Sequence, residues 1–293
     1  RINFNIMQSI KIQCPAKINL LLKVLNKRED GFHNIESIMQ TIDLFDYLTI
    51  NIENYSTSEI LLDGNNKEIP YNEKNLVYKA AKLFLDKTNL QNKKISIYID
   101  KSIPVSAGLA GGSTNAAGTL YGLNKIFKDI LTRDELNYLC AGLGSDLNVC
   151  LNGGRILATG RGEVTEPLEF EEFNVNLIKP KALGISAKEA YTKFAELKNN
   201  SKALKTRDNF ENDLEWAVIE DYPQLQFIKN KYPKSMMTGS GSTYFSLMEE
   251  FEQEDGYWIQ NGLRAIPFGV RVLATNNDEV SETYNNKKQG EII

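Results

Sequence analysis

A glycine-rich stretch between a predicted strand and a predicted helix places the strongest constraint on how this chain folds. The stretch reads Pro104-Val-Ser-Ala-Gly-Leu-Ala-Gly-Gly-Ser-Thr-Asn115. Residues 94–100 before it alternate and are rich in β-branched side chains, as strands are, and apolar residues recur at helical spacing over 117–127 after it. The pattern predicts a strand, a glycine loop and a helix whose first turn Ser113 and Thr114 can cap.

The glycine loop has the chemistry of a phosphate cradle. Glycines let backbone N–H groups approach an anion closely, and the unpaired N–H groups at a helix N-terminus attract negative charge. No lysine follows Gly112, which excludes the Walker A pattern, and the spacing of Gly108 and Gly111 does not fit a dinucleotide fingerprint. The sequence therefore predicts a phosphorylated ligand other than NAD. The alternative, a tight connection that needs glycine only for packing, stays open at this point.

Composition and charge exclude several other classes of protein. The 293 residues are 42% hydrophobic and 25% charged, which suits one large or two medium globular domains. A net charge of −4 offers no basic field for nucleic acid or for an anionic membrane. Cys14, Cys140 and Cys150 form no paired motif, so neither a disulfide framework nor a zinc site is expected. With no apolar run of membrane-spanning length and no signal-peptide pattern, we expect a cytoplasmic protein.

The rest of the pattern predicts mixed α and β structure. Strands are expected at 9–14 and 15–24 with a turn between them, and also at 43–52, 94–100, 175–178 and 244–248. Helices are expected at 75–86, 132–141 and 186–197, and further helices through 228 are expected after an Asn/Lys-rich loop over 198–208. A hairpin is expected over 155–163. Thr132 and Glu135 form a capping-box pattern. A second glycine loop over 237–243 precedes the last strand and can also hold an anion.

Two further side chains complete the set that phosphoryl transfer needs. The reaction requires a cradle for the donor phosphates, a cation for developing charge, and a group that orients or deprotonates the acceptor hydroxyl. Lys17 lies in the segment Pro-Ala-Lys-Ile-Asn. Asp146 lies in the segment Gly-Leu-Gly-Ser-Asp, which is typical of a turn, and a carboxylate in a turn can point into a cleft. Taken alone, Lys17 would be interpreted as a solvated surface lysine and Gly-Ser-Asp146 as an ordinary turn or helix cap. Together with the glycine loop, they indicate a phosphotransfer site.

These segments, in this order, resemble the three motifs of the GHMP kinases, and the resemblance covers nearly the whole chain. Within these kinases, the chain resembles the branch that phosphorylates the 2-hydroxyl of 4-diphosphocytidyl-2-C-methyl-D-erythritol in the non-mevalonate (MEP) route to isoprenoids. The segments that carry this resemblance are Pro15–Asn19, Arg28–His33 and Gly144–Asp146. The resemblance implies a two-domain α+β fold. A ribosomal protein S5 domain 2-like nucleotide-binding domain is expected over 1–160, and a ferredoxin-like substrate-binding domain over 161–293.

The resemblance also implies roles for individual residues. Lys17 and Asp146 are the implied catalytic pair, with Asp146 as base or orienting group and Lys17 holding it ionised. The implied ATP-binding residues are Asn75, Lys101, Pro104, Gly108, Leu109, Ala110, Gly111, Gly112, Ser113, Thr114 and Asn115. The implied substrate-binding residues are Asn19, Phe32, His33, Tyr191, Gly239, Ser240 and Gly241. Mg²⁺ is expected to arrive with ATP, with the Ser113 hydroxyl as a contact.

The aromatic members of the substrate-binding set suit a cytidine. Phe32 offers a face on which a pyrimidine can stack, and His33 can hydrogen-bond the edge of the base. By the resemblance, Tyr191 closes the other side of a sandwich on the base. Without the motif, His33 would be interpreted as an exposed turn residue and Tyr191 as a helix-core aromatic.

Three positions depart from the family pattern, and other functions stay open. Ser106 and Ala110 replace family glycines, which a loop tolerates where φ stays negative, and Asn148 replaces a family proline and can alter the turn that holds Asp146. The first alternative is another GHMP kinase, acting on homoserine, mevalonate or a sugar. The second is a nucleotide-binding regulator without catalysis. We expect a small-molecule substrate, no nucleic-acid or membrane partner, and a monomer or weak homodimer.

Overall fold

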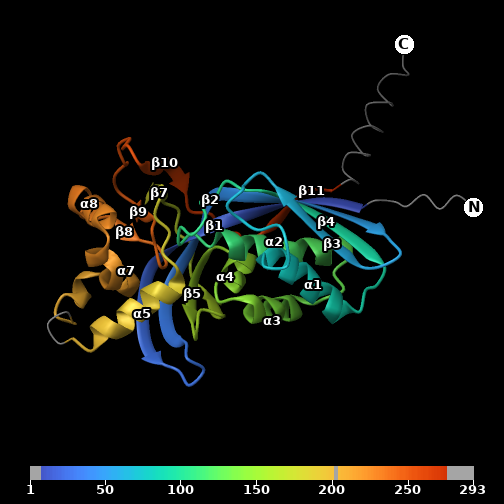
Figure 1. The fold of residues 1–293 in the computed structure, drawn as a ribbon, viewed down its shortest axis with the longest axis horizontal. Coiled ribbons are helices and arrows are strands. Elements are labelled where there is room, and N and C mark those ends of the chain that lie inside the picture. Colours follow the sequence, from blue (N-terminus) through green and yellow to red (C-terminus); the bar gives the residue numbers. More distant parts are fainter. Residues whose placement is uncertain (1–7, 201–203, 276–293) are drawn as a thin grey trace, which may run out of the picture.

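The computed structural model describes residues 8–200 and 204–275, which form two adjoining halves of mixed α and β structure (Figure 1). One half holds a seven-stranded sheet with helices on one face, and the other holds a four-stranded sheet with its own helices. This architecture confirms the predicted α+β class. Within the described ranges, no helix combines the length and the apolar character needed to cross a membrane.

The larger sheet has the strand order β11-β1-β2-β4-β3, while β5 pairs with β2 and β6 pairs with β5. Its strands are β1 (Gln8–Lys27), β2 (His33–Asn54), β3 (Glu59–Gly64), β4 (Lys93–Asp100), β5 (Arg155–Thr159), β6 (Val164–Pro167) and β11 (Arg271–Thr275). The helices beneath it are α1 (Leu76–Thr88), α2 (Gly111–Ile126), α3 (Arg133–Leu143) and α4 (Leu147–Asn152). Ile12, Ile50, Phe84 and Leu120 belong to the core that joins this sheet to its helices.

The smaller sheet has the order β10-β7-β9-β8. Its strands are β7 (Asn174–Pro180), β8 (Met236–Met237), β9 (Tyr244–Ser246) and β10 (Tyr257–Arg264). Its helices are α5 (Ala187–Lys198), α7 (Asp213–Val218) and α8 (Pro223–Lys231), with 3₁₀ turns at Arg207–Asn209 and Ile219–Asp221. The core here includes Phe194, Trp216 and Tyr244, together with Leu22 and Val24 of β1. The long strand β1 therefore contributes to both halves.

The two halves do not divide simply at residue 160, where the sequence predicts a boundary. Strand β6 pairs with β5, and β11 pairs with β1, so segments from beyond that residue complete the larger sheet. The smaller sheet begins at Asn174. The division into domains 1–160 and 161–293 stays a prediction.

Local sequence signals predicted several helix ends. Thr132 and Glu135 make both bonds of a capping box at the start of α3. Ser186 caps α5, because its side chain accepts a hydrogen bond from the N–H of Glu189. Helix α3 ends with Gly144 as its C-cap residue, slightly later than predicted. The predicted capping box is confirmed, because both of its partners lie close together in sequence, whereas the predicted end of the helix is two residues too early.

The predicted turn at Pro15 is wrong, because β1 runs unbroken over Gln8–Lys27. Its register against β2 shifts between Pro15 and Ala16. A bulge of this kind admits a residue that has no N–H group into a sheet. The same strand then continues to Lys17 and Asn19.

Two predictions about the glycine loop are also wrong. Ser106 and Ala110 adopt φ values of 50° and 59°, in the left-handed region and not in the negative range expected for them. Ser113 and Thr114 do not cap α2, because Ala110 is the N-cap residue and its side chain makes no cap hydrogen bond. The N–H groups of the first turn are therefore left for another acceptor, such as a bound anion.

Candidate active site

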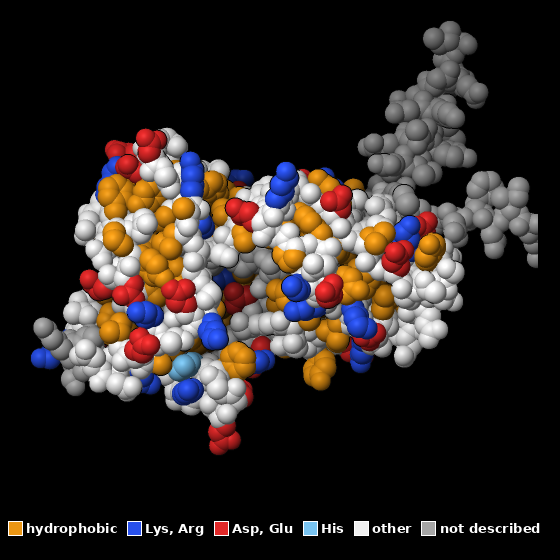
Figure 2. All heavy atoms as spheres, in the orientation of Figure 1, with side chains coloured by type: hydrophobic (Ala, Val, Ile, Leu, Met, Phe, Trp, Pro, Cys, Tyr) orange, Lys and Arg blue, Asp and Glu red, His pale blue; other side chains and the backbone are white. Residues whose placement is uncertain are grey.

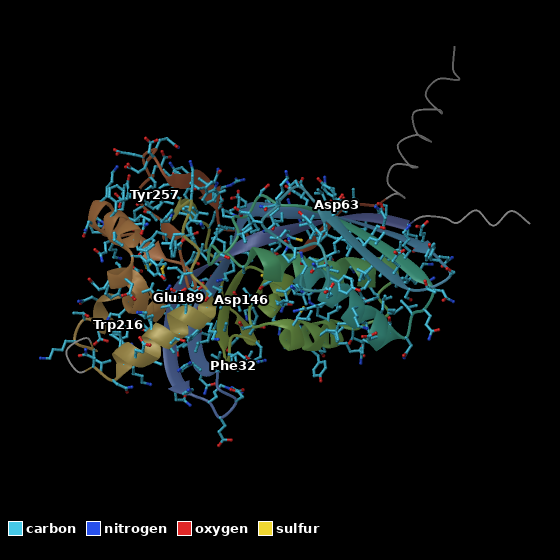
Figure 3. All side chains as sticks on the ribbon, viewed as in Figure 1. Phe32, Asp63, Asp146, Glu189, Trp216 and Tyr257 are labelled. Atoms are coloured by element: carbon cyan, nitrogen blue, oxygen red, sulfur yellow. The ribbon has the colours of Figure 1, made fainter. Side chains whose placement is uncertain are left out.

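The structure brings Lys17 and Asp146 together from distant parts of the chain. Lys17 lies on β1, and Asp146 is the N-cap residue of α4. Lys17 Nζ is 3.5 Å from Asp146 Oδ2, and the two side chains are 3% and 28% exposed, respectively. The ammonium is therefore buried, whereas the carboxylate still reaches solvent where the two halves of the molecule meet (Figure 3).

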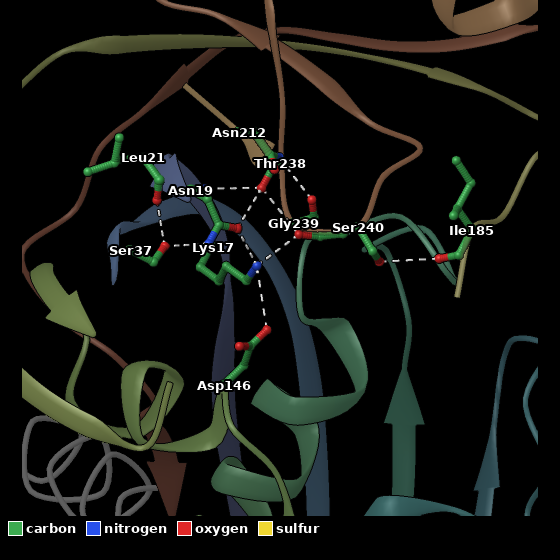
Figure 4. Close-up of polar contacts among 11 residues, drawn as sticks. Lys17, Asn19, Leu21, Ser37, Asp146, Ile185, Asn212, Thr238, Gly239 and Ser240 are labelled. Atoms are coloured by element: carbon green, nitrogen blue, oxygen red, sulfur yellow. Dashed lines mark hydrogen bonds and ion pairs between the residues drawn. The ribbon is translucent and has the colours of Figure 1, made fainter. Parts of the chain in front are cut away.

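Two acceptors besides Asp146 hold the Lys17 ammonium (Figure 4). Lys17 Nζ donates to Asn19 Oδ1 at 2.7 Å and to the backbone oxygen of Gly108 at 3.0 Å. An ammonium has three N–H donors, so these two bonds leave one to point at Asp146. The lysine is thus fixed between its own strand and the glycine loop.

Asn148 lies in the helix that begins at Asp146. Asn148 is buried within α4, and its Nδ2 donates to the backbone oxygen of Glu163 at 2.9 Å. This bond ties α4 to the turn between β5 and β6. In place of a rigid proline, this chain uses a side-chain hydrogen bond to hold the helix that begins at Asp146.

A hollow of about 440 Å³ contains this pair and opens onto the glycine loop. The predicted ATP-binding residues that line it are Asn75, Lys101, Pro104, Gly108, Ala110, Gly111, Gly112, Ser113 and Asn115. Leu109 and Thr114 are buried and do not line it. Helix α2 begins at the hollow, so its N-terminal N–H groups and the positive end of its dipole are available to phosphates there. ATP binding by these residues stays a prediction.

Gly108 is the position in this loop where a side chain fits worst. Its φ is +75°, and a Cβ atom built on it would lie 2.1 Å from the backbone oxygen of Thr238. Gly108→Ala is expected to lower the free energy of unfolding by about 2 kcal/mol or more, measured by urea unfolding. Gly112→Ala is the contrast, because its Cβ would meet only Leu76 Cδ1 at 3.8 Å. That variant is expected to keep or slightly raise stability, so equal losses for both would contradict this packing argument.

Lys101 and Asn75 line the hollow, but their side chains also have partners in the protein. Lys101 Nζ lies 2.5 Å from Asp46 Oδ2, and both side chains are almost fully buried. Asp46 Oδ1 accepts from the N–H groups of Ser102 and Ile103 at 2.7 and 2.8 Å. Asn75 Oδ1 caps α1. The sequence did not single out Asp46, since nothing local distinguishes it from other strand carboxylates.

A second hollow, of about 930 Å³, adjoins the first and holds the predicted cytidine site. The two share Ser145, Arg161, Ala187 and Tyr191 in their linings. Figure 2 shows this face of the molecule hollowed between the two halves. The base site and the catalytic pair are therefore parts of one continuous depression.

The aromatic residues are arranged differently from a simple sandwich. The rings of His33 and Tyr191 are nearly parallel, at 11°, with centroids 5.5 Å apart. Phe32 is 55% exposed, and the Arg161 guanidinium lies over its ring at 5.1 Å from the centroid. Sequence analysis missed Arg161, although it lies in the predicted hairpin. Base stacking between Phe32 and Tyr191 stays a prediction.

The environment of His33 favours its neutral form. Burial lowers the pKa of His33, and the positive charges of Lys27 and Lys198 lower it further. A neutral imidazole has one ring nitrogen that donates and one that accepts. The group can therefore pair with either a donor or an acceptor on the edge of a base.

The second glycine loop lies close to the first. Gly239 and Ser240 line the smaller hollow, whereas Gly241 does not. Ser240 Oγ donates to the backbone oxygen of Ile185 at 3.3 Å. The N–H of Gly241 donates to the backbone oxygen of Thr238 at 3.0 Å. The roles of Gly239, Ser240 and Gly241 in substrate binding stay predictions.

Comparisons with known proteins agree with this geometry. Residues 75–154 match the family model described as "GHMP kinases N terminal domain". A relative from Bacillus pumilus (strain SAFR-032), named 4-diphosphocytidyl-2-C-methyl-D-erythritol kinase, is 36% identical over 90% of this chain and 97% of its own length. A relative of the same name from Caldanaerobacter subterraneus subsp. tengcongensis is 38% identical over 83% of this chain and 90% of its own.

Solved structures show the same fold. A crystal structure of 4-(cytidine 5'-diphospho)-2C-methyl-D-erythritol kinase matches with a TM-score of 0.66 and 25% identity, over 88% of this chain and all of the other. A crystal structure of a mevalonate kinase matches with a TM-score of 0.64 and 17% identity, over 88% of this chain and 99% of the other. The chain is therefore a GHMP kinase with the predicted fold. Within that superfamily it belongs to the 4-diphosphocytidyl-2-C-methyl-D-erythritol kinase family.

Proposed function

We propose that this chain transfers the γ-phosphoryl group of ATP to the 2-hydroxyl of 4-diphosphocytidyl-2-C-methyl-D-erythritol, giving the 2-phosphate in the non-mevalonate route to isoprenoids. The observation that carries the proposal is the buried Lys17 ammonium 3.5 Å from Asp146, in a hollow that begins at a glycine loop. The adjoining hollow, which Phe32 and His33 line, supports a cytidine compound as the acceptor. Family membership supports the same reaction.

The catalytic pair acts on the acceptor hydroxyl. Asp146 accepts a hydrogen bond from the 2-hydroxyl, orients its oxygen toward the γ-phosphorus and takes up the proton as the new P–O bond forms. Because phosphoryl transfer has a loose transition state, orientation counts for more than early deprotonation. Lys17 stabilises the ionised carboxylate and the charge on the transferred group. The N–H groups of Gly111 and Gly112 at the start of α2 bind the donor phosphates.

The residues around the hollow fit an ATP-bound Mg²⁺. Magnesium prefers oxygen ligands and binds through one or two protein groups together with phosphates and water. The Ser113 hydroxyl and the Asp146 carboxylate both line the hollow. Among residues 8–200 and 204–275, no cluster of three His, Cys, Asp or Glu side chains forms a separate metal site. The ion would neutralise charge on the β- and γ-phosphates, with Ser113 as its protein contact.

Arg161 extends this proposal to the diphosphate of the acceptor. Its side chain lines both hollows and is therefore situated between the base site and the catalytic pair. A guanidinium is well suited to phosphate oxygens, to which it can donate two parallel hydrogen bonds. We propose that Arg161 binds the diphosphate that links cytidine to methylerythritol.

Phe32→Ala is expected to raise the KM for the cytidine acceptor about 10-fold while kcat and the KM for ATP change little. The variant removes a stacking face that touches the acceptor but not the reacting atoms. Steady-state kinetics with each substrate varied in turn will show this. Tyr98→Ala is the matched control, because Tyr98 is a 43% exposed aromatic on β4 that lines neither hollow. A similar rise in acceptor KM in both variants would contradict the base site.

The proposed function is tested by ADP release from MgATP with 4-diphosphocytidyl-2-C-methyl-D-erythritol as acceptor. Homoserine, mevalonate and galactose serve as competing acceptors in parallel assays. Selective turnover of the cytidine compound is expected. Turnover of another acceptor would keep the kinase chemistry and refute the cytidine site. ATP binding without any turnover would refute the enzyme assignment.

We also propose that the protein is cytoplasmic and works as a monomer or weak homodimer without nucleic-acid or membrane partners. Cys14, Cys140 and Cys150 are all free and buried, which suits a reducing compartment. The net charge of −4 supports a small-molecule substrate over a polyanionic partner.

A further inference from the structure

Thr238, in the second glycine loop, has a buried hydroxyl that contacts both acceptors of the Lys17 ammonium. Its Oγ1 lies 3.2 Å from Asn19 Oδ1 and 3.2 Å from the backbone oxygen of Gly108. The same atom accepts a hydrogen bond from the backbone N–H of Asn19 at 3.1 Å. The residue is fully buried and lines neither hollow. It therefore lies behind the lysine and not against a ligand.

Asn19 passes this constraint on to the lysine. Its Oδ1 accepts from Lys17 Nζ at 2.7 Å, and its Nδ2 donates to Ser37 Oγ at 2.9 Å (Figure 4). Ser37 donates in turn to the backbone oxygen of Leu21 at 2.6 Å, so it is available to Asn19 only as an acceptor. The carboxamide can therefore face only one way, with its oxygen toward Lys17 and Thr238.

Asn212 holds the loop from its other side. Its Nδ2 donates to the backbone oxygens of Met237 and Gly239, at 2.7 and 2.9 Å, and these carbonyls flank Thr238. Asn212 is buried, and its Oδ1 caps α7. The smaller half of the molecule thus sets where the Thr238 hydroxyl lies, and that hydroxyl braces the two groups that hold Lys17.

We propose that Thr238 is a positioning residue that fixes the Lys17 ammonium against Asp146 and thereby couples the second glycine loop to phosphoryl transfer. The inference rests on the proposed kinase function. Thr238 lines neither hollow, so removing its hydroxyl deletes no group that faces a ligand, but it loosens the two acceptors that hold Lys17. The effect should therefore appear in kcat and not in substrate affinity, because small displacements of a catalytic group slow the chemical step.

The test compares valine and serine at this position in the full chain. Thr238→Val keeps the size of the side chain and is expected to lower kcat about 10-fold, with both KM values within about twofold of the unmodified chain. Thr238→Ser keeps the hydroxyl and is expected to restore most of the rate. Thr243→Val is the matched control, since Thr243 is fully buried in the same loop and its hydroxyl has no hydrogen-bond partner among the described residues. It is expected to retain the unmodified kcat.

A double variant separates positioning from general destabilisation. In a Lys17→Met chain, Thr238→Val is expected to cause no further loss of the residual rate, because its effect acts through the lysine. An unchanged kcat in Thr238→Val, an equal loss in Thr243→Val, or a second full loss in the Lys17→Met background would overturn the proposal.

Crystal structures of the two valine variants make the test independent of the acceptor. Lys17 Nζ is expected to leave its position between Asn19 Oδ1 and the Gly108 oxygen in Thr238→Val and to keep it in Thr243→Val. An unmoved ammonium in Thr238→Val would overturn the inference. Failure of the unmodified chain to phosphorylate the cytidine compound would instead contradict the proposed function.

Discussion

Replacing Asp146 with asparagine is expected to reduce kcat by about 10³-fold while the affinity for ATP stays within about twofold. The amide preserves the size of the side chain and its position at the start of α4, but it carries no charge to pair with Lys17 at 3.5 Å. It also cannot take up the proton of the acceptor hydroxyl. Rates are measured by ADP release, and ATP binding is measured separately by calorimetry.

Asp134→Asn provides the control for this substitution. Asp134 is an exposed aspartate in the first turn of α3, so the same chemical change is made at a helix start away from the hollow. This variant is expected to keep full activity. Full turnover in Asp146→Asn would refute the proposed mechanism. A parallel loss of ATP affinity would show that Asp146 acts mainly in binding the donor.

Features that depend on neighbouring residues could be predicted from the sequence. The strand, the glycine loop and α2 follow one another as predicted, and the capping box of Thr132 and Glu135 forms in full. The helix predicted over 186–197 also forms, as α5. In each case the partner lies within a few residues, so the local pattern determines the contact.

Features that depend on distant partners could not be predicted in this way. Pro15 looks like a turn residue, but pairing with β2 carries the strand through it by a bulge. Ala110 takes a positive φ, which its sequence alone would not favour, because the surrounding loop fixes it there. The acceptors of Lys17 illustrate the same point at the site. Asn19 is close in sequence, but Gly108 and Asp146 reach the ammonium only through the tertiary fold.

Replacing Asp46 with alanine is expected to lower the free energy of unfolding by roughly 3–5 kcal/mol. The carboxylate is fully buried, 2.5 Å from the Lys101 ammonium, and accepts from the N–H groups of Ser102 and Ile103. Its removal leaves a buried cation and two backbone donors without their acceptor. Urea unfolding followed by circular dichroism measures the change, and the slope of the transition checks that unfolding stays two-state.

Asp86→Ala is the matched control, because Asp86 pairs with Lys82 at 3.0 Å but both side chains are more than half exposed. Solvent already screens that pair, so its loss is expected to change stability little. Asp46→Ala combined with Lys101→Met should be more stable than Asp46→Ala alone, since the uncompensated charge is gone. Equal losses at Asp46 and Asp86 would contradict the argument that burial decides the effect. Because the chain runs from Lys101 directly into the glycine loop, Asp46→Ala is also expected to raise the KM for ATP, whereas Asp86→Ala is not.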